Sequence, residues 1–383
     1  MLVMGRPPRR VKKVTAECRA LHGKMPLMRS LASSPIMDGM AVADSRHSAR
    51  TKRVATWLFI CCALVFAMVV VGGVTRLTHS GLSIVEWQPI VGTLPPLSDA
   101  QWQQTFEKYQ LTPEYQLVNK GMGLDEFKLI FWWEYWHRLL GRLIGVVFLA
   151  PFLWFVARRD IPPNHALKYL AIFALGGLQG VMGWYMVKSG LVDDPRVSQF
   201  RLTAHLGLAL AIFWAMLWTG LSLVSPRRAA IVPRSLRNWA YGIAALVFVM
   251  MMSGGFVAGI RAGFAYNTFP LMNGHFVPPE IFSLDPLWRN FFWNMATVQF
   301  DHRIIAWLIA FLVPVLWLKV RLADYVPRRA RWGGHLLLML AFAQIALGIA
   351  TLVNVVPLPL AAMHQAGAVL VLAAAINIAH ALR

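Results

Sequence analysis

Residues 54–74 read VATWLFICCALVFAMVVVGGV, a run of 21 residues without a charged side chain. A helix rises about 1.5 Å per residue, so such a run crosses the roughly 30 Å hydrocarbon core of a bilayer. Seven further apolar runs follow in the 383-residue chain, and they predict spans at about 130–157, 168–187, 202–224, 238–260, 300–318, 332–354 and 360–382. The expected fold class is an all-α polytopic membrane protein with eight transmembrane helices.

The composition favours the same class. Apolar residues make up 57% of the chain and charged residues 14%, too little charge to cover a soluble surface. The 37 Lys and Arg exceed the 17 Asp and Glu, and the net charge of +20 would suggest nucleic acid if the protein were soluble. In a membrane protein, cations gather in the inner loops. With an inner N-terminus, 25 cations fall in inner segments and nine in outer loops.

This distribution predicts the bilayer as a partner and no nucleic acid. Both termini are expected on the cytoplasmic side of the cell inner membrane, or on the equivalent side of the mitochondrial inner membrane. Residues 1–53 hold 12 of the cations and no long apolar run, so a disordered basic tail is predicted there. The first outer loop, 75–129, is long enough to be a functional lid or to carry short helices of its own.

The chain also repeats itself. His137-Arg138 recurs as His302-Arg303 at an offset of 165, and His205 recurs as His364 at an offset of 159. The other recurring features, in the same order in both halves, are GGVTR at 72–76 with GGFVAGIR at 254–261, Gln179 with Gln344, and Gly183 with Gly348. Such matches indicate a duplication. We therefore predict two pseudo-symmetric four-helix bundles, 54–225 and 226–383, related by an axis along the membrane normal.

The four repeated histidines are expected at one depth. The apolar part of the second span, 143–157, has only 15 residues, so EYWHRLLGR at 134–142 must complete the span near the outer surface. The sixth span poses the same problem at His302. His205 and His364 fall in the first turns of helices that begin on the outside.

Two histidines per bundle are what a bis-histidine haem site requires, because a low-spin iron takes one imidazole on each porphyrin face. We predict His137 with His205, and His302 with His364, as two such pairs. A single histidine at a helix end is more often interfacial, but four at matched depth favour ligation. Arg138 and Arg303 are placed to meet haem propionates, for which a guanidinium group is suited.

One position differs between the repeats. Glu134 lies three residues before His137, on the same helix face, and Gln299 stands at the equivalent place before His302. A carboxylate in one bundle only predicts one reactive site, with Glu134 as its catalytic residue, and one electron-transfer site. The alternative is that Glu134 forms a structural ion pair with Arg138 at i+4.

Five stretches carry a resemblance to a known family. They are GGVTRLTHSGLSIVEWQPIVGTLPPL at 72–97, EYWHRLLGR at 134–142, AYNTFPLMNG at 265–274, FDHR at 300–303 and AAMHQAG at 361–367. Together they resemble heme A synthase of the mitochondrial and alphaproteobacterial type, over residues 55–382. The resemblance implies an oxidoreductase that oxidises the C8 methyl group of heme O to the formyl group of heme A, for aa3-type terminal oxidases.

Position by position, the resemblance implies that His302 and His364 are axial ligands of the iron of a heme b cofactor. His137 and His205 would hold the iron of the substrate, heme O. Glu134 matches the glutamate of the family's ExxH motif. The cysteine pair that some members carry in the first outer loop is absent here, so its redox role does not transfer.

The resemblance further implies a transient complex with heme O synthase, the protoheme farnesyltransferase, and it leaves a homo-oligomer open. The main alternative function is a di-haem b-type electron carrier linked to quinone. A second alternative is a secondary transporter, which would place ionisable groups at the midplane. A pure carrier gives no reason for a carboxylate at Glu134 and an amide at Gln299.

Overall fold

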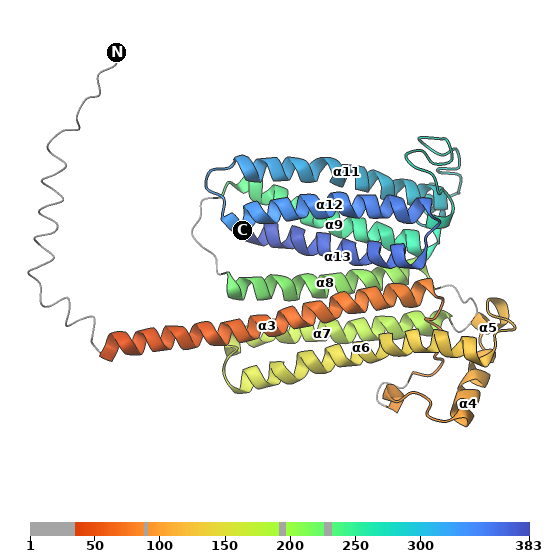
Figure 1. Cartoon of the computed structure of the whole chain (residues 1–383), viewed down its shortest axis with the longest axis horizontal. Helices are drawn as coiled ribbons and strands as arrows, with labels where there is room; N and C mark the ends of the chain where they lie inside the picture. The colour runs from red at the N-terminus through yellow and green to blue at the C-terminus, as the bar shows by residue number, and fades with distance from the viewer. Residues whose placement is uncertain (1–34, 88–90, 191–196, 226–231) are drawn as a thin grey trace, which may run out of the picture. The chain divides into compact units, whose positions relative to one another are not determined.

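The computed structural model describes residues 35–87, 91–190, 197–225 and 232–383 (Figure 1). Its contacts divide the chain into two units, Met1–Arg53 and Val54–Arg383. The first helix, α3, runs over Pro35–Leu77, so the backbone of residues 35–53 of the predicted tail is helical. Residues 1–34 of the predicted tail lie outside the described residues.

All eight predicted spans are confirmed as helices that are long and apolar enough to cross a membrane. After the span in α3, they are α6 (Leu124–Ala157), α7 (Pro163–Gly190), α8 (Gln199–Val224), α9 (Arg234–Gly259), α11 (Met295–Leu322), α12 (Arg328–Val353) and α13 (Leu358–Ala381). Each span begins two to six residues before the predicted start. Hydropathy detects only the part inside hydrocarbon, whereas the helices continue into polar and aromatic ends. The chain is a multi-pass membrane protein.

Helix contacts follow the order of the chain. In the second half, α9, α11, α12 and α13 run alongside one another (Figure 1), and their contacts close a ring in the order α9, α11, α12, α13. In the first half, α7 contacts α6 and α8, and Trp57 of α3 donates to Val147 O of α6 at 2.8 Å. Because α8 also contacts α9 and α13, the spans share one hydrophobic core, and the division into two bundles stays a prediction.

The first outer loop carries short helices of its own, as predicted: η1 (Val91–Thr93), α4 (Asp99–Gln110) and α5 (Pro113–Leu117). Aromatic side chains of α4 pack on the outer end of α6. Trp102 lies 4.9 Å from Phe131 between ring centroids, and Tyr109 lies 5.0 Å from Phe127. This packing explains why α6 extends beyond the hydrocarbon. The second outer connection, after α9, holds η2 (Ala262–Phe264), η3 (Leu287–Arg289) and α10 (Asn290–Trp293).

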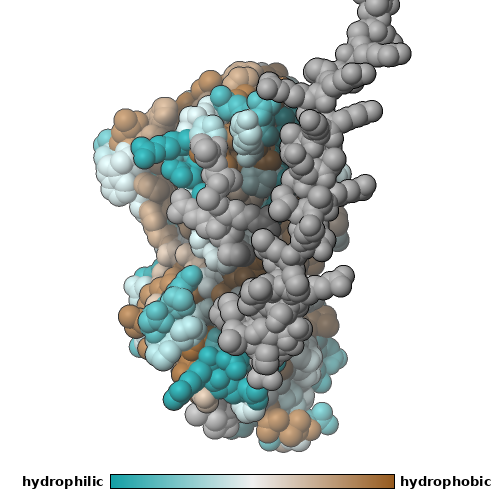
Figure 2. Space-filling model, turned by 90° about the vertical axis from the view of Figure 1, so that its left-hand side faces the viewer, coloured by the Kyte–Doolittle hydropathy of each residue, from teal (hydrophilic) through white to brown (hydrophobic). Residues whose placement is uncertain are grey.

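Figure 2 shows the opposite end of the spans, where α11 connects to α12. Hydrophilic residues gather in patches at this end, and hydrophobic residues lie along the sides. This distribution is typical of a helix bundle whose sides face lipid.

Candidate functional site

The four predicted histidines lie on four different helices, two in each half. His137 is on α6 and His205 on α8, and the two side chains lie near each other. His302 on α11 and His364 on α13 are likewise near each other. The structure therefore brings the predicted pairs together.

A glycine from a neighbouring helix lies against each imidazole. A Cβ atom added at Gly72 would lie 3.1 Å from His137 Nε2, and one added at Gly183 would lie 3.2 Å from His205 Cε1. In the second half the equivalent distances are 3.4 Å for Gly254 with His302 Cε1 and 2.7 Å for Gly348 with His364 Cε1. All four helices of each half thus contribute to its site, two with a histidine and two with a glycine.

Two glutamines at equivalent positions of the repeat form hydrogen bonds to the helices that carry His205 and His364. Gln179 Nε2 donates to His205 O at 3.0 Å, and Gln344 Nε2 donates to His364 O at 2.7 Å. Gln344 Nε2 also lies 3.0 Å from His364 Nδ1, and Ser253 Oγ lies 2.6 Å from His302 Nδ1. A hydrogen bond to one ring nitrogen fixes the orientation of the ring and leaves the other nitrogen for a ligand bond.

These residues fit a haem. Two imidazoles per site are too few to hold a bare metal ion, but they suffice for a haem iron, which has four further ligands in the porphyrin. Among the described residues, no three His, Cys, Asp or Glu side chains gather as a metal-binding group. Because each imidazole packs against a glycine, no Cβ atom takes up the space next to the ring.

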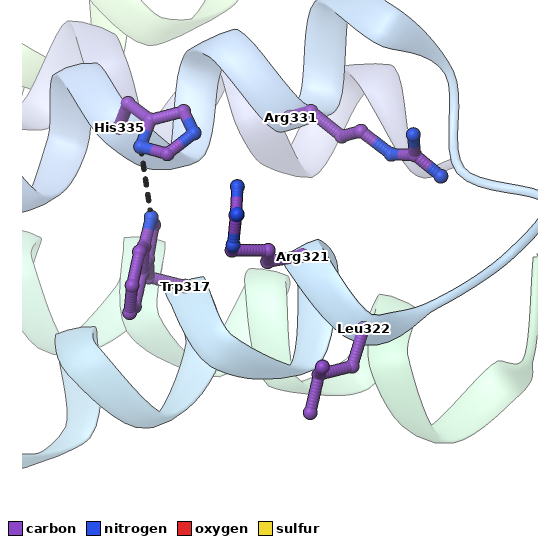
Figure 3. A pocket seen from close by; sticks show the side chains of 5 residues that line it. All are labelled: Trp317, Arg321, Leu322, Arg331 and His335. Carbon is purple, nitrogen blue, oxygen red and sulfur yellow. Dashed lines mark hydrogen bonds between the residues drawn. The ribbon is translucent and has the colours of Figure 1, made fainter.

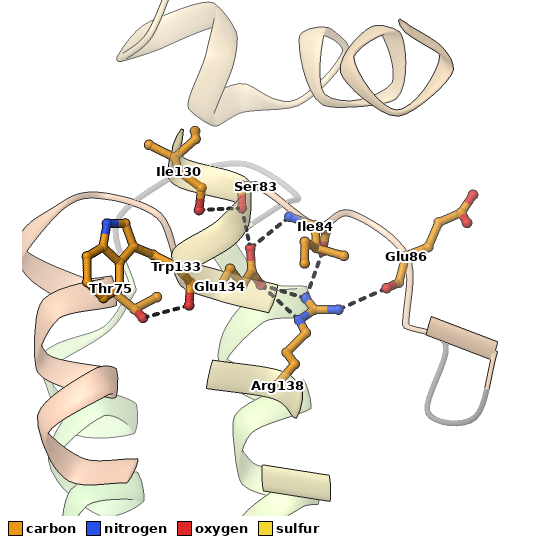
Figure 4. Close-up of polar contacts among 8 residues, drawn as sticks. All are labelled: Thr75, Ser83, Ile84, Glu86, Ile130, Trp133, Glu134 and Arg138. Carbon is orange, nitrogen blue, oxygen red and sulfur yellow. Dashed lines mark hydrogen bonds and ion pairs between the residues drawn. The ribbon is translucent and has the colours of Figure 1, made fainter. Parts of the chain in front are cut away.

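Glu134 is buried, with 2% of its surface exposed, and it accepts four hydrogen bonds (Figure 4). Its Oε2 accepts from Ser83 Oγ and from the Ile84 backbone N–H, both at 2.7 Å. Its Oε1 accepts from Nε and Nη2 of Arg138 at 3.0 and 2.7 Å. The ion pair between Glu134 and Arg138, predicted as the alternative role of this carboxylate, is therefore present. Four donors suit an ionised carboxylate.

Gln299, at the equivalent place in the second half, is 3% exposed. Its Nε2 donates to the Ala262 carbonyl at 2.7 Å, and its Oε1 accepts from Arg303 at 3.1 Å. Both halves therefore join this position to an arginine and to the outer connection. The hydrogen bond to the backbone runs in opposite directions in the two halves, because Glu134 accepts from an N–H group and Gln299 donates to a carbonyl.

The two arginines hold the outer connections. Arg138 donates to the backbone carbonyls of Ile84 at 2.7 Å and of Glu86 at 3.0 Å. Arg303 donates to four carbonyls, those of Tyr266, Thr268, Pro270 and Leu271. A haem propionate would have to share the guanidinium N–H groups that already bind these carbonyls. The role of Arg138 and Arg303 as propionate ligands therefore stays a prediction.

A charged cluster lies at the outer ends of α3 and α9. Arg76 donates to the Gly259 carbonyl at 3.4 Å, and the guanidinium of Arg261 lies 3.1 Å from His79 Nδ1. Glu114 of α5 is 5% exposed. Burial raises the pKa of Glu114 to about 7, and the positive charges of Arg76 and Arg261 act in the opposite direction.

Comparison with known proteins identifies the family. Residues 55–376 match the model of the COX15-CtaA family, described as cytochrome oxidase assembly protein. This match includes six of the spans in full and most of the first and the last.

The chain belongs to this family.

Relatives in the cytochrome oxidase assembly family extend over nearly the same length. A protein of Nitrosospira multiformis named heme A synthase is 62% identical over 87% of this chain and 94% of its own. A heme A synthase of Nitrosomonas eutropha is 55% identical over 88% and 95% of the two chains, and one of Parvibaculum lavamentivorans is 48% identical over 91% and 98%. The resemblance to heme A synthase is confirmed.

Sequence reasoning missed several groups of the family site. Ser83 and the Ile84 N–H were not expected to hold Glu134, although the segment GLSIVEW that contains them stands out as a motif. The repeat relates Gln179 to Gln344, but it does not predict their hydrogen bonds to the histidine backbones. No motif or repeat marks Glu114, because its position near two arginines arises only when the chain folds.

Proposed function

We propose that this chain is an enzyme that oxidises the C8 methyl group of heme O to a formyl group, which gives heme A. Relatives named heme A synthase, up to 62% identical, support the proposal. The observation that carries it is the difference between two otherwise equivalent histidine sites. A buried carboxylate, Glu134, lies three residues before His137 on α6, and a buried neutral amide, Gln299, lies three residues before His302 on α11.

In this proposal His137 and His205 hold the iron of heme O, and His302 and His364 hold the iron of heme b. When bound, heme b supplies a one-electron redox centre. At the position equivalent to Glu134 the second pair has the neutral amide of Gln299, which suits a site that passes electrons on.

The methyl carbon passes through two hydroxylations, from CH3 to CH2OH and then to CH(OH)2. The gem-diol loses one water molecule to give the formyl group. Each hydroxylation takes its oxygen atom from one water molecule and releases two protons and two electrons, and the four electrons pass to an external electron acceptor.

Glu134 provides a fixed negative charge on α6, three residues before His137. Its four hydrogen bonds hold the carboxylate in one orientation without reorganisation. A preorganised charge in a water-poor site stabilises opposite charge that develops during a reaction. We infer that Glu134 stabilises positive charge developing on the porphyrin as its methyl group is oxidised.

We place the protein in a bacterial cell membrane with both termini in the cytoplasm. The 25 cations in inner segments against nine in outer loops support this orientation, and the relatives named above come from bacteria. We also propose a transient complex with heme O synthase, because heme O is too hydrophobic to leave the membrane readily.

The test uses Glu134→Ala in cells that make heme O. We expect the variant to keep its haems and to form heme A at least about 100-fold more slowly, the scale seen when one preorganised group is removed. Pigments extracted from the purified protein and separated by chromatography measure heme O, heme A and heme b. Glu107→Gln, an exposed carboxylate of α4, is the matched control and should behave as wild type.

Normal heme A formation by Glu134→Ala would leave that carboxylate with only its structural role in the ion pair. A wild-type protein that holds two heme b groups and neither heme O nor heme A, in the same cells, would refute the synthase and favour the electron carrier.

A further inference from the structure

A cavity of about 370 Å³ lies between the end of α11 and the start of α12, far along both helices from the histidine sites. It is lined by Trp317, Arg321 and Leu322 of α11 and by Arg331 and His335 of α12 (Figure 3). These five residues include two guanidinium groups and no carboxylate.

The polar groups of the cavity offer hydrogen-bond donors. Trp317 Nε1 donates to His335 Nδ1 at 3.0 Å, so the remaining ring nitrogen of His335 carries a hydrogen. One guanidinium nitrogen of Arg331 donates to the carbonyls of Ala323 and Asp324 at 3.1 and 3.2 Å, which orients its side chain. The guanidinium of Arg321 has no partner in the described part of the chain and stands between α11 and α12 (Figure 3).

The repeat shows that the fold does not require these cations. The connection from α6 to α7 matches the connection from α11 to α12 at the offset of 165. At the positions of Trp317, Arg321, Arg331 and His335, the first half has only apolar residues, namely Phe152, Val156, Ala166 and Leu170. The cationic cavity is therefore specific to the second half of the chain.

The surroundings favour a lipid as the ligand. The cavity lies at the ends of two predicted spans, at the level of lipid headgroups. Leu322 is 71% exposed, and Trp332 beside the cavity is 75% exposed, as residues that contact the membrane interface are. Basic pockets between transmembrane helices bind the headgroups of anionic lipids.

We propose that the cavity formed by Trp317, Arg321, Leu322, Arg331 and His335 binds the phosphate group of an anionic phospholipid. The two guanidinium groups neutralise the phosphate, and the exposed apolar residues of α11 and α12 contact the acyl chains. The haem sites play no part in this binding.

Native mass spectrometry of the full chain in detergent tests the proposal. The titrants are dioleoyl-phosphatidylglycerol, dioleoyl-phosphatidylcholine with the same acyl chains, and inorganic phosphate. We expect the anionic lipid to bind at least about tenfold more tightly than the zwitterionic lipid. Arg321→Gln should weaken its binding about fivefold, and the double variant Arg321→Gln, Arg331→Gln about 25-fold, on the scale of one basic residue at a lipid surface.

Arg328→Gln removes one charge from the same connection without touching the cavity, and it should stay within about twofold of wild type. Equal loss in Arg321→Gln and Arg328→Gln would overturn the proposal. So would equal affinity of the wild type for the two lipids, a comparison that needs no variant to fold. Inorganic phosphate that binds as tightly as the anionic lipid would show a site for free anions instead.

Discussion

Four glycines decide where the four histidines can lie. Gly72, Gly183, Gly254 and Gly348 come from four different helices, and each lies against one imidazole. Any larger residue would place its Cβ atom 2.7 to 3.2 Å from the ring at Gly72, Gly183 and Gly348, closer than ordinary van der Waals contact, and 3.4 Å from it at Gly254. The size of these residues is therefore part of the site, although none of them can bind a metal.

The first prediction concerns Gly183→Ala. The added methyl group would lie 3.2 Å from His205 Cε1 and would displace the ring. We expect the variant to hold heme O about 10 to 100 times more weakly, the effect typical of groups that orient a metal ligand. Heme O and heme b in the purified protein, measured by extraction, should show loss of the first and retention of the second.

Gly180→Ala is the matched control, because it lies one turn earlier on α7 and a Cβ atom there meets nothing within 4 Å. Alanine favours a helix over glycine by up to about 1 kcal/mol, so this variant should be as stable as wild type or slightly more so. Equal loss of heme O from Gly180→Ala and Gly183→Ala would show that the effect of Gly183 on heme O binding does not depend on its contact with His205.

At the scale of elements, the outer helices close the first half of the molecule. The aromatic side chains of α4 pack on α6, and the loop before α4 places Ser83 and Ile84 on Glu134. The short helix α5 brings Glu114 under the surface near the ends of α3 and α9. The outer loop is therefore part of the site and not a mere connection.

The second prediction is a pH dependence carried by α5. Burial raises the pKa of Glu114 from 4.5 to about 7. Between pH 4.5 and 7 the carboxyl of Glu114 is protonated in the folded state and ionised in the unfolded state. The contribution of Glu114 to the free energy of unfolding is therefore greatest below pH 4.5 and is lost as the pH rises through 7. Glu114→Gln should remove this part of the pH dependence.

Thermal unfolding in detergent at pH 5 and pH 8 measures the effect. Relative to wild type, Glu114→Gln should gain stability at pH 8 more than at pH 5. Glu126→Gln, whose carboxylate caps α6, is the control that should not show this gain. Identical pH profiles for wild type and Glu114→Gln would contradict the assignment.

At the scale of the whole spanning region, the two halves meet through equivalent helices. The first helix of each half contacts the last helix of the other. Gln365 of α13 lies against Gly73 of α3 and donates to Val69 O at 2.8 Å. In the same way, α8 approaches α9, where Thr203 lies against Gly255 and Gln199 against Gly259. The close approach depends on small residues, as is common between transmembrane helices.

The third prediction tests this interface with Gly259→Ala. Its Cβ atom would lie 2.5 Å from Gln199 Cβ and 2.8 Å from Gln199 Cα, so rotation of a side chain gives no relief. We expect a loss of about 1–3 kcal/mol in the free energy of unfolding, the usual cost of overpacking. Unfolding in detergent measures it. Gly242→Ala on the same helix meets nothing within 4 Å and should be neutral, and an equally stable Gly259→Ala would show that α8 can move away.

The spans, the repeat and the prediction of two histidine pairs follow from the order of the amino acids alone. Apolar runs such as 54–74 can only be satisfied in a bilayer as helices, because a backbone in hydrocarbon must form its own hydrogen bonds. The offset of 165 between His137 and His302 and the difference between Glu134 and Gln299 are also written in the order of residues. These features are local or periodic, so they need no coordinates.

The surroundings of these residues depend on how the helices pack in three dimensions. The contacts of Ser83 and Ile84 with Glu134 join residues about 50 positions apart, and the contact of Gln365 with α3 joins residues 296 positions apart. The cationic cavity between α11 and α12 and the burial of Glu114 likewise depend on which helix faces which. Periodicity fixes the direction in which a residue points along its own helix, but the neighbour that it meets is set by the packing of all the helices together.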